Sequence, residues 1–566
     1  MINPLKKVSG LLPVALTSCL SSMAQTSTHE ISEQRPNILW ISTEDFSPHL
    51  GCYGDPLAQT PNIDRLASQG IRFTHVFTTA AISAPVRAGM ITGMYQTSIG
   101  SMHMRTTSYR SNVDNPPLEF TAVPPHYVKA FTEYLRTAGY YCTNNSKTDY
   151  QFAKDPVPES IWDESSNNAH YKNRPDKDQP FFAVFNFMGT HESRNWDISN
   201  VKTDPSKVVV PPYYPDTEIV RRNIAKMYDN IALLDAFVSR LLDELEKEGV
   251  ADNTIVFFWG DHGDGLPRAK RWLYDSGLNI PLIIRWPKHL KPGSVNNELI
   301  SSIDFGPTVL SLAGVKIPVH MQGQAFLGDQ KKEPRKYVFA TRDRVDESYD
   351  MIRSVRNKDY LYIRNFYPNE PYHIWIPYLN RMPIMQEVMR LDAENKLNVF
   401  QKQWMANNRP PEELYDVNAD PYQLNNLADD PKYKEVLEEM RRQQKQWSRE
   451  TGDMGYMNEP EMIEQMWQGG IQPVTDNPYF IINAKEDRGL KKYQTGGSFS
   501  DPMTLSFHCP THGASIVYTT EAGDNPHWKL YNGPLHLFKG THSIRIKAVR
   551  YGYKSSDMVE GVFVIK

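Results

Sequence analysis

Cysteine is scarce in this sequence, with only four residues among 566. One of them, Cys19, lies in an N-terminal segment that we expect to be processed, which leaves Cys52, Cys142 and Cys509. An odd and widely spaced set argues against a disulfide framework, and the spacing does not match a zinc site. We therefore expect a fold that is stabilised by its hydrophobic core.

Runs of Lys and Arg are also missing. The formal net charge is −4 and 23% of the residues are charged, so we expect no nucleic-acid partner. The apolar stretch near the N-terminus follows Lys6 and Lys7 and is too short to span a bilayer. It predicts a secretory leader over residues 1–24 and an exported, periplasmic protein. Residues 16–19 (Leu-Thr-Ser-Cys) resemble a lipoprotein cleavage site, so lipidation at Cys19 and a location on the bacterial surface are the alternative.

Four apolar, β-rich runs end at polar residues of catalytic type. They cover residues 37–43, 139–145, 181–189 and 254–260, and the polar residues that follow include Glu44, Asp45, Lys147, Asp149, His191, Asp261 and His262. Helical patterns lie at residues 60–70, where Thr60 is the expected N-cap, and at 220–249. Alternating strands and helices predict an α/β domain with a mainly parallel sheet. Sites in such sheets collect beyond the carboxyl ends of the strands.

The remaining chain predicts two smaller units. We expect the α/β domain to cover residues 35–350 and an α+β subdomain to cover 351–484, with a turn-rich connection at 413–428 and a helix at 430–450. A polar linker at 485–500 then leads to alternating apolar runs at 501–566, which are typical of a small β-sandwich. A chain of this length is expected to form two or three domains.

Two strand ends carry four groups that can bind a metal. Glu44, Asp45, Asp261 and His262 are able to surround one divalent cation. An oxygen-rich set suits calcium or magnesium, and the imidazole leaves room for manganese or zinc. The alternative is that these side chains only cap turns.

Ser83 opens the stretch Ser-Ala-Pro-Val-Arg, which predicts the first turn of a helix. Its hydroxyl could be a nucleophile, or simply an N-cap. Helix N-termini favour anions, and Arg87 adds a cation one turn later.

Five further residues are candidates for the same crevice. Lys147 and Lys270 follow strand ends, although most lysines are solvated surface residues. His191 is placed for proton transfer. His103 and Arg105 are either substrate ligands or ordinary loop residues.

These segments resemble the type I sulfatases of the alkaline phosphatase superfamily over about residues 35–447. The resemblance is carried by RPNILWISTED, by SAPVRAGMITG, by GDHG with Lys270 and YDSGLNIPLIIRWP, and by ELYDVNADPYQLNNLA. STEDFSPHLGCYG and PRAKRWLYDSG are most similar to the bacterial heparan N-sulfatase-like branch.

The resemblance implies a sulfatase fold and a mechanism. It implies that a radical maturase oxidises Ser83 to formylglycine (3-oxoalanine), the serine-type variant. It implies one divalent ion, calcium first, bound by Glu44, Asp45, Ser83, Asp261 and His262. It further implies catalytic roles for Arg87, Lys147, His191 and Lys270, with His191 as the acid that protonates the leaving group.

The sequence departs from this family at three positions. Glu44 replaces the usual first Asp, His262 stands where many members have Asn, and Asp149 stands where a histidine assists turnover of formylglycine. We expect Asp149 to face the substrate, and an ionised Asp accepts a proton but does not donate one.

A sulfated glycan is the expected substrate, because the chain carries an export signal and a β-rich appendage. The aromatic stretch at residues 362–378 either stacks on sugar rings or packs a domain interface. Two other functions stay open: a phosphomonoester or phosphonate hydrolase of the same superfamily, and a glycan-binding pseudoenzyme in which Ser83 remains serine.

Overall fold

The computed structural model describes residues 35–104, 106, 119–154, 156–485 and 494–566. The leader and Arg105 therefore lie outside the described residues. Residues 35–566 form one compact unit. In this part of the chain no helix combines the length and the hydropathy that crossing a membrane requires.

An eight-stranded sheet forms the centre of the first region, in the order β4-β3-β5-β1-β6-β7-β2-β8. Its strands are β1 (Asn37–Thr43), β2 (Ile71–Phe77), β3 (Tyr141–Asn145), β4 (Glu164–Ser165), β5 (Phe181–Phe187), β6 (Thr254–Gly260), β7 (Leu282–Arg285) and β8 (Ser294–Ser301). Only β7 runs antiparallel to its neighbours, β6 and β2. The predicted α/β fold with a mainly parallel sheet is confirmed.

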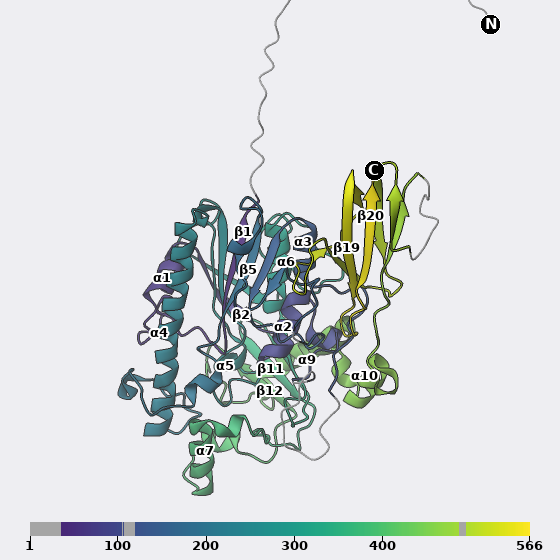
Figure 1. Ribbon diagram of the computed structural model, residues 1–566. Helices are drawn as coiled ribbons and strands as arrows, with labels where there is room; N and C mark the ends of the chain where they lie inside the picture. Colours follow the sequence, from purple (N-terminus) through teal and green to yellow (C-terminus); the bar gives the residue numbers. More distant parts are fainter. Residues whose placement is uncertain (1–34, 105, 107–118, 155, 486–493) are drawn as a thin grey trace, which may run out of the picture. The chain divides into compact units, whose positions relative to one another are not determined.

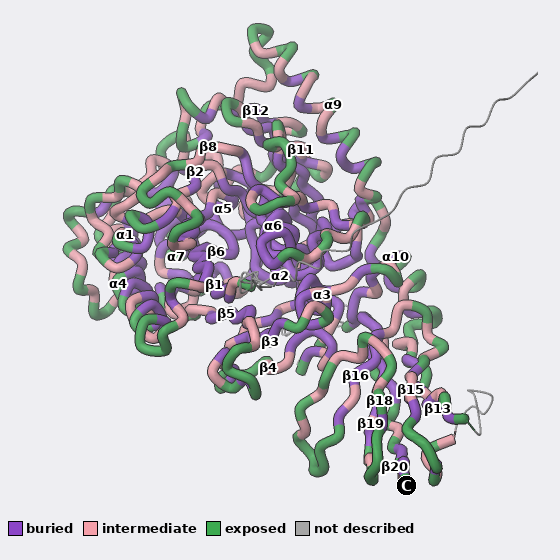
Figure 2. The backbone as a smooth tube through the Cα atoms, turned by 90° about the horizontal axis from the view of Figure 1, so that it is seen from above, coloured by how far each residue is buried: buried purple, intermediate pink, exposed green. Residues whose placement is uncertain are grey.

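The predicted apolar runs are strands because both faces of the sheet are covered. Every residue of β1 and of β6 is buried, so neither strand alternates between apolar and polar residues. Helices α1 (Pro61–Ser68) and α4 (Glu218–Lys247) cover one face, and α2 (Ser83–Thr92), α3 (Phe131–Thr137) and α6 (Phe305–Leu312) cover the other (Figure 1). Burial is continuous through β1, β6 and α2, and β5 is buried except at its last two residues (Figure 2).

Both predicted helices lie where the sequence placed them, but one predicted N-cap makes no capping hydrogen bond. Thr60 occupies the N-cap position of α1, yet its side chain makes no capping hydrogen bond. Its hydroxyl instead accepts a hydrogen bond from the Gly51 amide at 2.9 Å and donates to Asp64 at 3.2 Å. The Thr60 hydroxyl therefore binds the segment after β1 instead of a backbone amide of α1.

The second region is built on a four-stranded antiparallel sheet in the order β12-β11-β10-β9. It comprises β9 (Val338–Arg342), β10 (Ile352–Arg356), β11 (Tyr360–Asn365) and β12 (Glu412–Asp416), with helices α5 (Asp275–Leu278), α7 (Pro383–Ala393), α8 (Val399–Trp404), α9 (Lys434–Thr451) and α10 (Glu459–Met466) elsewhere in the chain. β9 precedes the expected boundary at residue 351. The expected turn-rich connection at 413–428 begins within β12, because residues 412–416 pair with β11.

The C-terminal unit is the expected β-sandwich. One sheet has the order β13-β15-β18 and the other β14-β20-β19-β16-β17, and the core between them includes Phe480, Leu505 and Phe563. The strands are β13 (Tyr479–Asn483), β14 (Gly496–Phe499), β15 (Met503–His508), β16 (Ser515–Thr519), β17 (Lys529–Leu530), β18 (Leu535–Leu537), β19 (Gly540–Val549) and β20 (Val559–Ile565). The sandwich begins before the expected boundary at residue 501, because β13 pairs with β15 and β14 pairs with β20. The predicted linker at 485–500 therefore contains strand β14.

Candidate active site

The ends of three adjacent strands bring the acidic groups together. Because β5, β1 and β6 are neighbours in the sheet, the residues after Thr43 and Gly260 meet at its carboxyl edge. Glu44, Asp45 and Asp261 are each at most 2% exposed. The Asp45 amide donates to Asp261 Oδ1 at 3.0 Å, and Asp45 adopts a left-handed φ of 50°. This strained turn aims both carboxylates into one space.

The donor set fits one divalent cation. Ligand atoms of Asp45, Asp261 and His262 lie within 4.8 Å of one another, and so do those of Glu44, Asp45 and His191. Asp261 Oδ2 is buried and accepts no hydrogen bond from the described residues, although Arg87 Nε lies 3.4 Å away. A buried carboxylate oxygen with this one ion pair can still accept a bond to a metal ion. Asp45, Asp261 and His262 are thus close enough to share an ion, while Glu44 belongs to a second group with Asp45 and His191.

Ser83 is the first residue of α2, and its hydroxyl does not cap the helix. Ser83 Oγ instead lies 3.3 Å from Glu44 Oε2 and 3.2 Å from His262 Nε2. The hydroxyl at the N-terminus of α2 therefore faces the acidic groups. It is not the N-cap that the sequence analysis gave as the alternative.

Two cations hold Glu44. Arg87 and Lys147 both form ion pairs with its carboxylate. Burial would raise the pKa of Glu44, but the two cations outweigh burial and hold the pKa well below its usual value. Asn186 accepts a hydrogen bond from Arg87 at 2.9 Å and so orients the guanidinium. The predicted Arg87 and Lys147 therefore lie in the site.

A second chain of charges holds Asp45 and includes two residues that the sequence analysis did not single out. Lys270 Nζ lies 2.7 Å from Asp45 Oδ2 and 3.0 Å from Glu192 Oε1. Arg271 binds Glu192 through two hydrogen bonds of 2.7 and 2.9 Å. Glu192 directly follows His191 and Arg271 directly follows Lys270 along the chain. This adjacency is the feature of the sequence that could have indicated their place in the site.

His191 follows β5 and is half-buried. Its Nδ1 lies 2.9 Å from the Ser193 hydroxyl. Burial and the Lys270 cation lower its pKa, in spite of the neighbouring carboxylates. The ring is thus a stronger acid than an exposed histidine.

The predicted substrate ligands are in different surroundings. Asp149 adopts a φ of 57° and pairs with Lys147 at 3.4 Å, with 37% of its side chain exposed. His103 is only 1% exposed and its Nδ1 accepts the Arg344 amide at 3.2 Å. Burial lowers the pKa of His103 to about 4. Asp149 is therefore accessible to a ligand, whereas His103 is part of the core.

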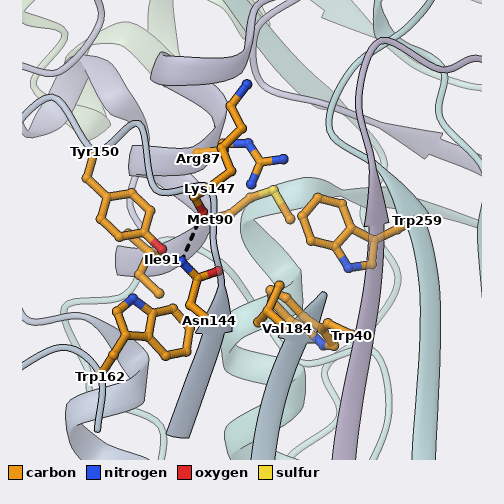
Figure 3. A pocket seen from close by; sticks show the side chains of 10 residues that line it. All are labelled: Trp40, Arg87, Met90, Ile91, Asn144, Lys147, Tyr150, Trp162, Val184 and Trp259. Carbon is orange, nitrogen blue, oxygen red and sulfur yellow. Dashed lines mark hydrogen bonds between the residues drawn. The ribbon is translucent and has the colours of Figure 1, made fainter. Parts of the chain in front are cut away.

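A cavity of about 30 Å³ lies next to Arg87 and Lys147 (Figure 3). Its wall includes the indoles of Trp40, Trp162 and Trp259, with mainly apolar neighbours. It is too small for a sugar and belongs to the space between the sheet and α2. The candidate active site is formed by the charged side chains at the carboxyl edge of the sheet, and not by this cavity.

The site holds equal numbers of carboxylates and of Lys and Arg cations, all of them buried except Lys147, whose side chain is 15% exposed. The carboxylates are those of Glu44, Asp45, Asp261 and Glu192, and the cations are Arg87, Lys147, Lys270 and Arg271. A divalent cation would add positive charge to this balanced set. Such a site favours an anionic group such as sulfate.

Comparison with known proteins identifies the family of the chain. The Sulfatase family matches residues 36–315, and the C-terminal family of N-sulphoglucosamine sulphohydrolase matches residues 268–375. A Formosa agariphila protein named ulvan-active sulfatase is 41% identical, with 99% of this chain and 97% of that protein aligned. N-sulphoglucosamine sulphohydrolase of Homo sapiens is 26% identical over 77% of this chain and 95% of its own length.

A solved structure shares the fold. BT4656, determined in complex with its substrate D-glucosamine-2-N,6-O-disulfate, superposes with a TM-score of 0.52 and 21% identity, and the alignment covers 75% of this chain and 99% of that one. With the family match, the sequence identity and the fold in agreement, the chain belongs to the sulfatase family, and it is a sulfuric ester hydrolase.

Proposed function

We propose that the chain is an exported carbohydrate sulfatase that uses formylglycine derived from Ser83 and one divalent cation. The observation that carries the proposal is the position of the Ser83 hydroxyl, 3.3 Å from Glu44 and 3.2 Å from His262 at a helix N-terminus. A serine that served only the fold would be expected to cap its own helix.

Glu44, Asp45, Asp261 and His262, with the oxygen at position 83, would hold the cation. Calcium is the expected ion because carboxylates dominate the set. When present, the ion withdraws electrons from sulfate oxygens, and the hydrated aldehyde supplies a stronger nucleophile than serine. A radical maturase is the partner that would make this aldehyde.

The chain's own cations would bind and orient the sulfate group. Arg87 and Lys147 meet at Glu44, and Lys270 reaches the neighbouring Asp45, so three positive groups border one space. His191 would give a proton to the leaving oxygen, or to the leaving nitrogen of a sulfamate. Because its Nδ1 contacts Ser193, Nε2 is the atom assigned to this transfer. Asp149 would contact the sugar.

A sulfated polysaccharide is the proposed substrate class. The relative with 41% identity is named for ulvan, and the structural relative binds an N- and O-sulfated glucosamine. Ulvan oligosaccharides are therefore the first substrates to test, and N-sulfated glucosamine is the second. The leader at residues 1–24 supports export to the periplasm, with lipidation at Cys19 as the alternative.

The decisive experiment measures the mass of the peptide that contains Ser83, from protein made anaerobically in a host with a serine-type maturase. Conversion of the hydroxymethyl group to an aldehyde removes two hydrogen atoms. We expect this loss, together with sulfate release that Ser83→Ala abolishes. An unmodified serine, from a host that matures a control sulfatase, would refute the mechanism and favour the glycan-binding pseudoenzyme. Faster hydrolysis of phosphate than of sulfate esters would favour the phosphoesterase alternative.

A further inference from the structure

We propose that Tyr349, Tyr367 and Trp375 form a binding site for sugar rings that lie beyond the sulfated residue in the active site. We call these three side chains the aromatic platform. The inference rests on the proposed function, because it assumes a glycan substrate, and it adds that the substrate is longer than one sugar.

The platform residues are exposed, whereas the other aromatic side chains of residues 362–378 are buried or half-buried. Tyr349, Tyr367 and Trp375 are 41%, 42% and 66% exposed. Tyr362 and Tyr372, from the same stretch of sequence, are 0% and 3% exposed. The buried residues therefore stabilise the subdomain, and the exposed ones contribute little to its core. Large aromatic side chains that gather at a surface commonly mark a binding site.

The three residues are held together by the loop at residues 343–350. The rings of Tyr349 and Tyr367 are 6.1 Å apart and nearly perpendicular, at 78°. The Ser348 hydroxyl donates to the carbonyl oxygen of Trp375, which fixes that segment against the loop. Val345 and Ser348 exchange two backbone hydrogen bonds of 3.0 Å. A platform that is ordered in this way loses little conformational entropy when a sugar binds.

The same loop starts beside the catalytic residues. The Thr341 amide, at the end of β9, donates to the Thr79 carbonyl at 2.8 Å, and the Arg271 amide donates to the Ala81 carbonyl at 2.7 Å. Thr79 and Ala81 lie just before Ser83. Asp346, inside the loop, is close enough to Arg271 to contribute to its raised pKa. A glycan that places its sulfate at Ser83 can therefore extend along this loop.

His103 supports the platform from the core. Its ring lies 5.9 Å from that of Tyr349, and its Nδ1 accepts the Arg344 amide, within the loop, at 3.2 Å. This arrangement gives the histidine that sequence analysis assigned to substrate binding a positioning role. It acts through Tyr349, since only 1% of the His103 surface is exposed.

The chemistry of the platform suits pyranose rings. One face of such a ring carries mainly C–H groups, which stack on an aromatic face, while the hydroxyl and sulfate groups at the rim remain in water. Aromatic stacking contributes a roughly two- to tenfold change in affinity for each ring. Trp375 has the largest exposed ring of the three and is the residue to change first.

The test measures binding and not turnover, so it is independent of maturation. Size-fractionated ulvan oligosaccharides are titrated by calorimetry into Ser83→Ala protein that also carries Trp375→Ala or Trp375→Phe. We expect Trp375→Ala to raise Kd for the longer fractions by about two- to tenfold and Trp375→Phe to restore part of the loss. Phe538→Ala is the matched control, because Phe538 is 65% exposed on the β-sandwich. It should leave every Kd unchanged.

Two outcomes would overturn the inference. One is equal affinity of the Trp375→Ala and Phe538→Ala proteins for every fraction. The other is absence of binding of any fraction to the Ser83→Ala protein. Either result leaves the proposed function to its own test, since sulfate release by the mature enzyme and the mass of the Ser83 peptide are measured separately. Thermal unfolding of each variant verifies that the exposed substitutions leave the fold intact.

Discussion

The buried ion pair between Glu192 and Arg271 offers a quantitative test of how the site is held. Glu192 is 1% exposed, and its oxygens contact Arg271 at 2.7 and 2.9 Å and Lys270 at 3.0 Å. Glu192→Gln preserves the shape of the side chain but removes the charge. Arg271 would then lack its buried counter-ion, and Lys270 would keep only Asp45, so we expect the folded state to lose stability.

The expected loss follows from the pKa of Glu192. Burial raises this pKa, but Arg271 and Lys270 outweigh burial and lower it from 4.5 to about 2. That depression corresponds to about 3 kcal/mol of stability at neutral pH. Breaking one partner of a buried pair costs about 3–5 kcal/mol, which is the same range. Because the pKa of a carboxyl is depressed, the contribution is complete above pH 4.5 and is lost as the pH falls through about 2.

Urea denaturation at pH 7 measures the change in free energy of unfolding. Glu246→Gln makes the same chemical change on the exposed side of α4, and it should alter stability by less than about 0.5 kcal/mol. Arg271→Met should cost much less in the Glu192→Gln background than in the wild-type protein. A loss below about 1 kcal/mol for Glu192→Gln, or strict additivity of the two substitutions, would refute the reasoning.

Two further outcomes are expected. The buried His103 has a pKa of about 4, below its ordinary 6.5, because burial disfavours its charged form. In the unfolded protein this histidine binds a proton at a higher pH, so the free energy of unfolding falls by about 3 kcal/mol as the pH drops from 6.5 to 4. His103→Gln should flatten this part of the pH profile in urea denaturation. An unchanged slope would contradict the prediction. Chelation of the metal with EDTA should stop sulfate release and lower the midpoint of thermal unfolding, and added calcium should restore both. A free calcium concentration of a hundred times Kd corresponds to about 2.7 kcal/mol of stabilisation of the folded state. An unaltered midpoint would exclude a tightly held ion.

The amino-acid sequence by itself was sufficient for the strands and for the polar residues at their ends. Continuous apolar runs such as residues 37–43 and 254–260 have one stable solution, a sheet that is covered on both faces, and they became β1 and β6. Residues that follow such strands must emerge at the carboxyl edge. Glu44, Asp45, Asp261 and His262 were therefore predictable as one cluster from local pattern alone.

Tertiary structure alone decided which of these groups touch. Strand order places β5, β1 and β6 side by side, and only this order lets Lys270 reach both Asp45 and Glu192. Thr60 was expected to cap its helix, but its hydroxyl accepts a hydrogen bond from the Gly51 amide instead. Within the aromatic stretch at residues 362–378, Tyr362 is buried because it packs against Leu437 and Met440 of α9, whereas Trp375 stays 66% exposed. Sequence determines what each segment can bury, whereas contacts between distant segments determine which polar atoms find partners and which stay available for a ligand.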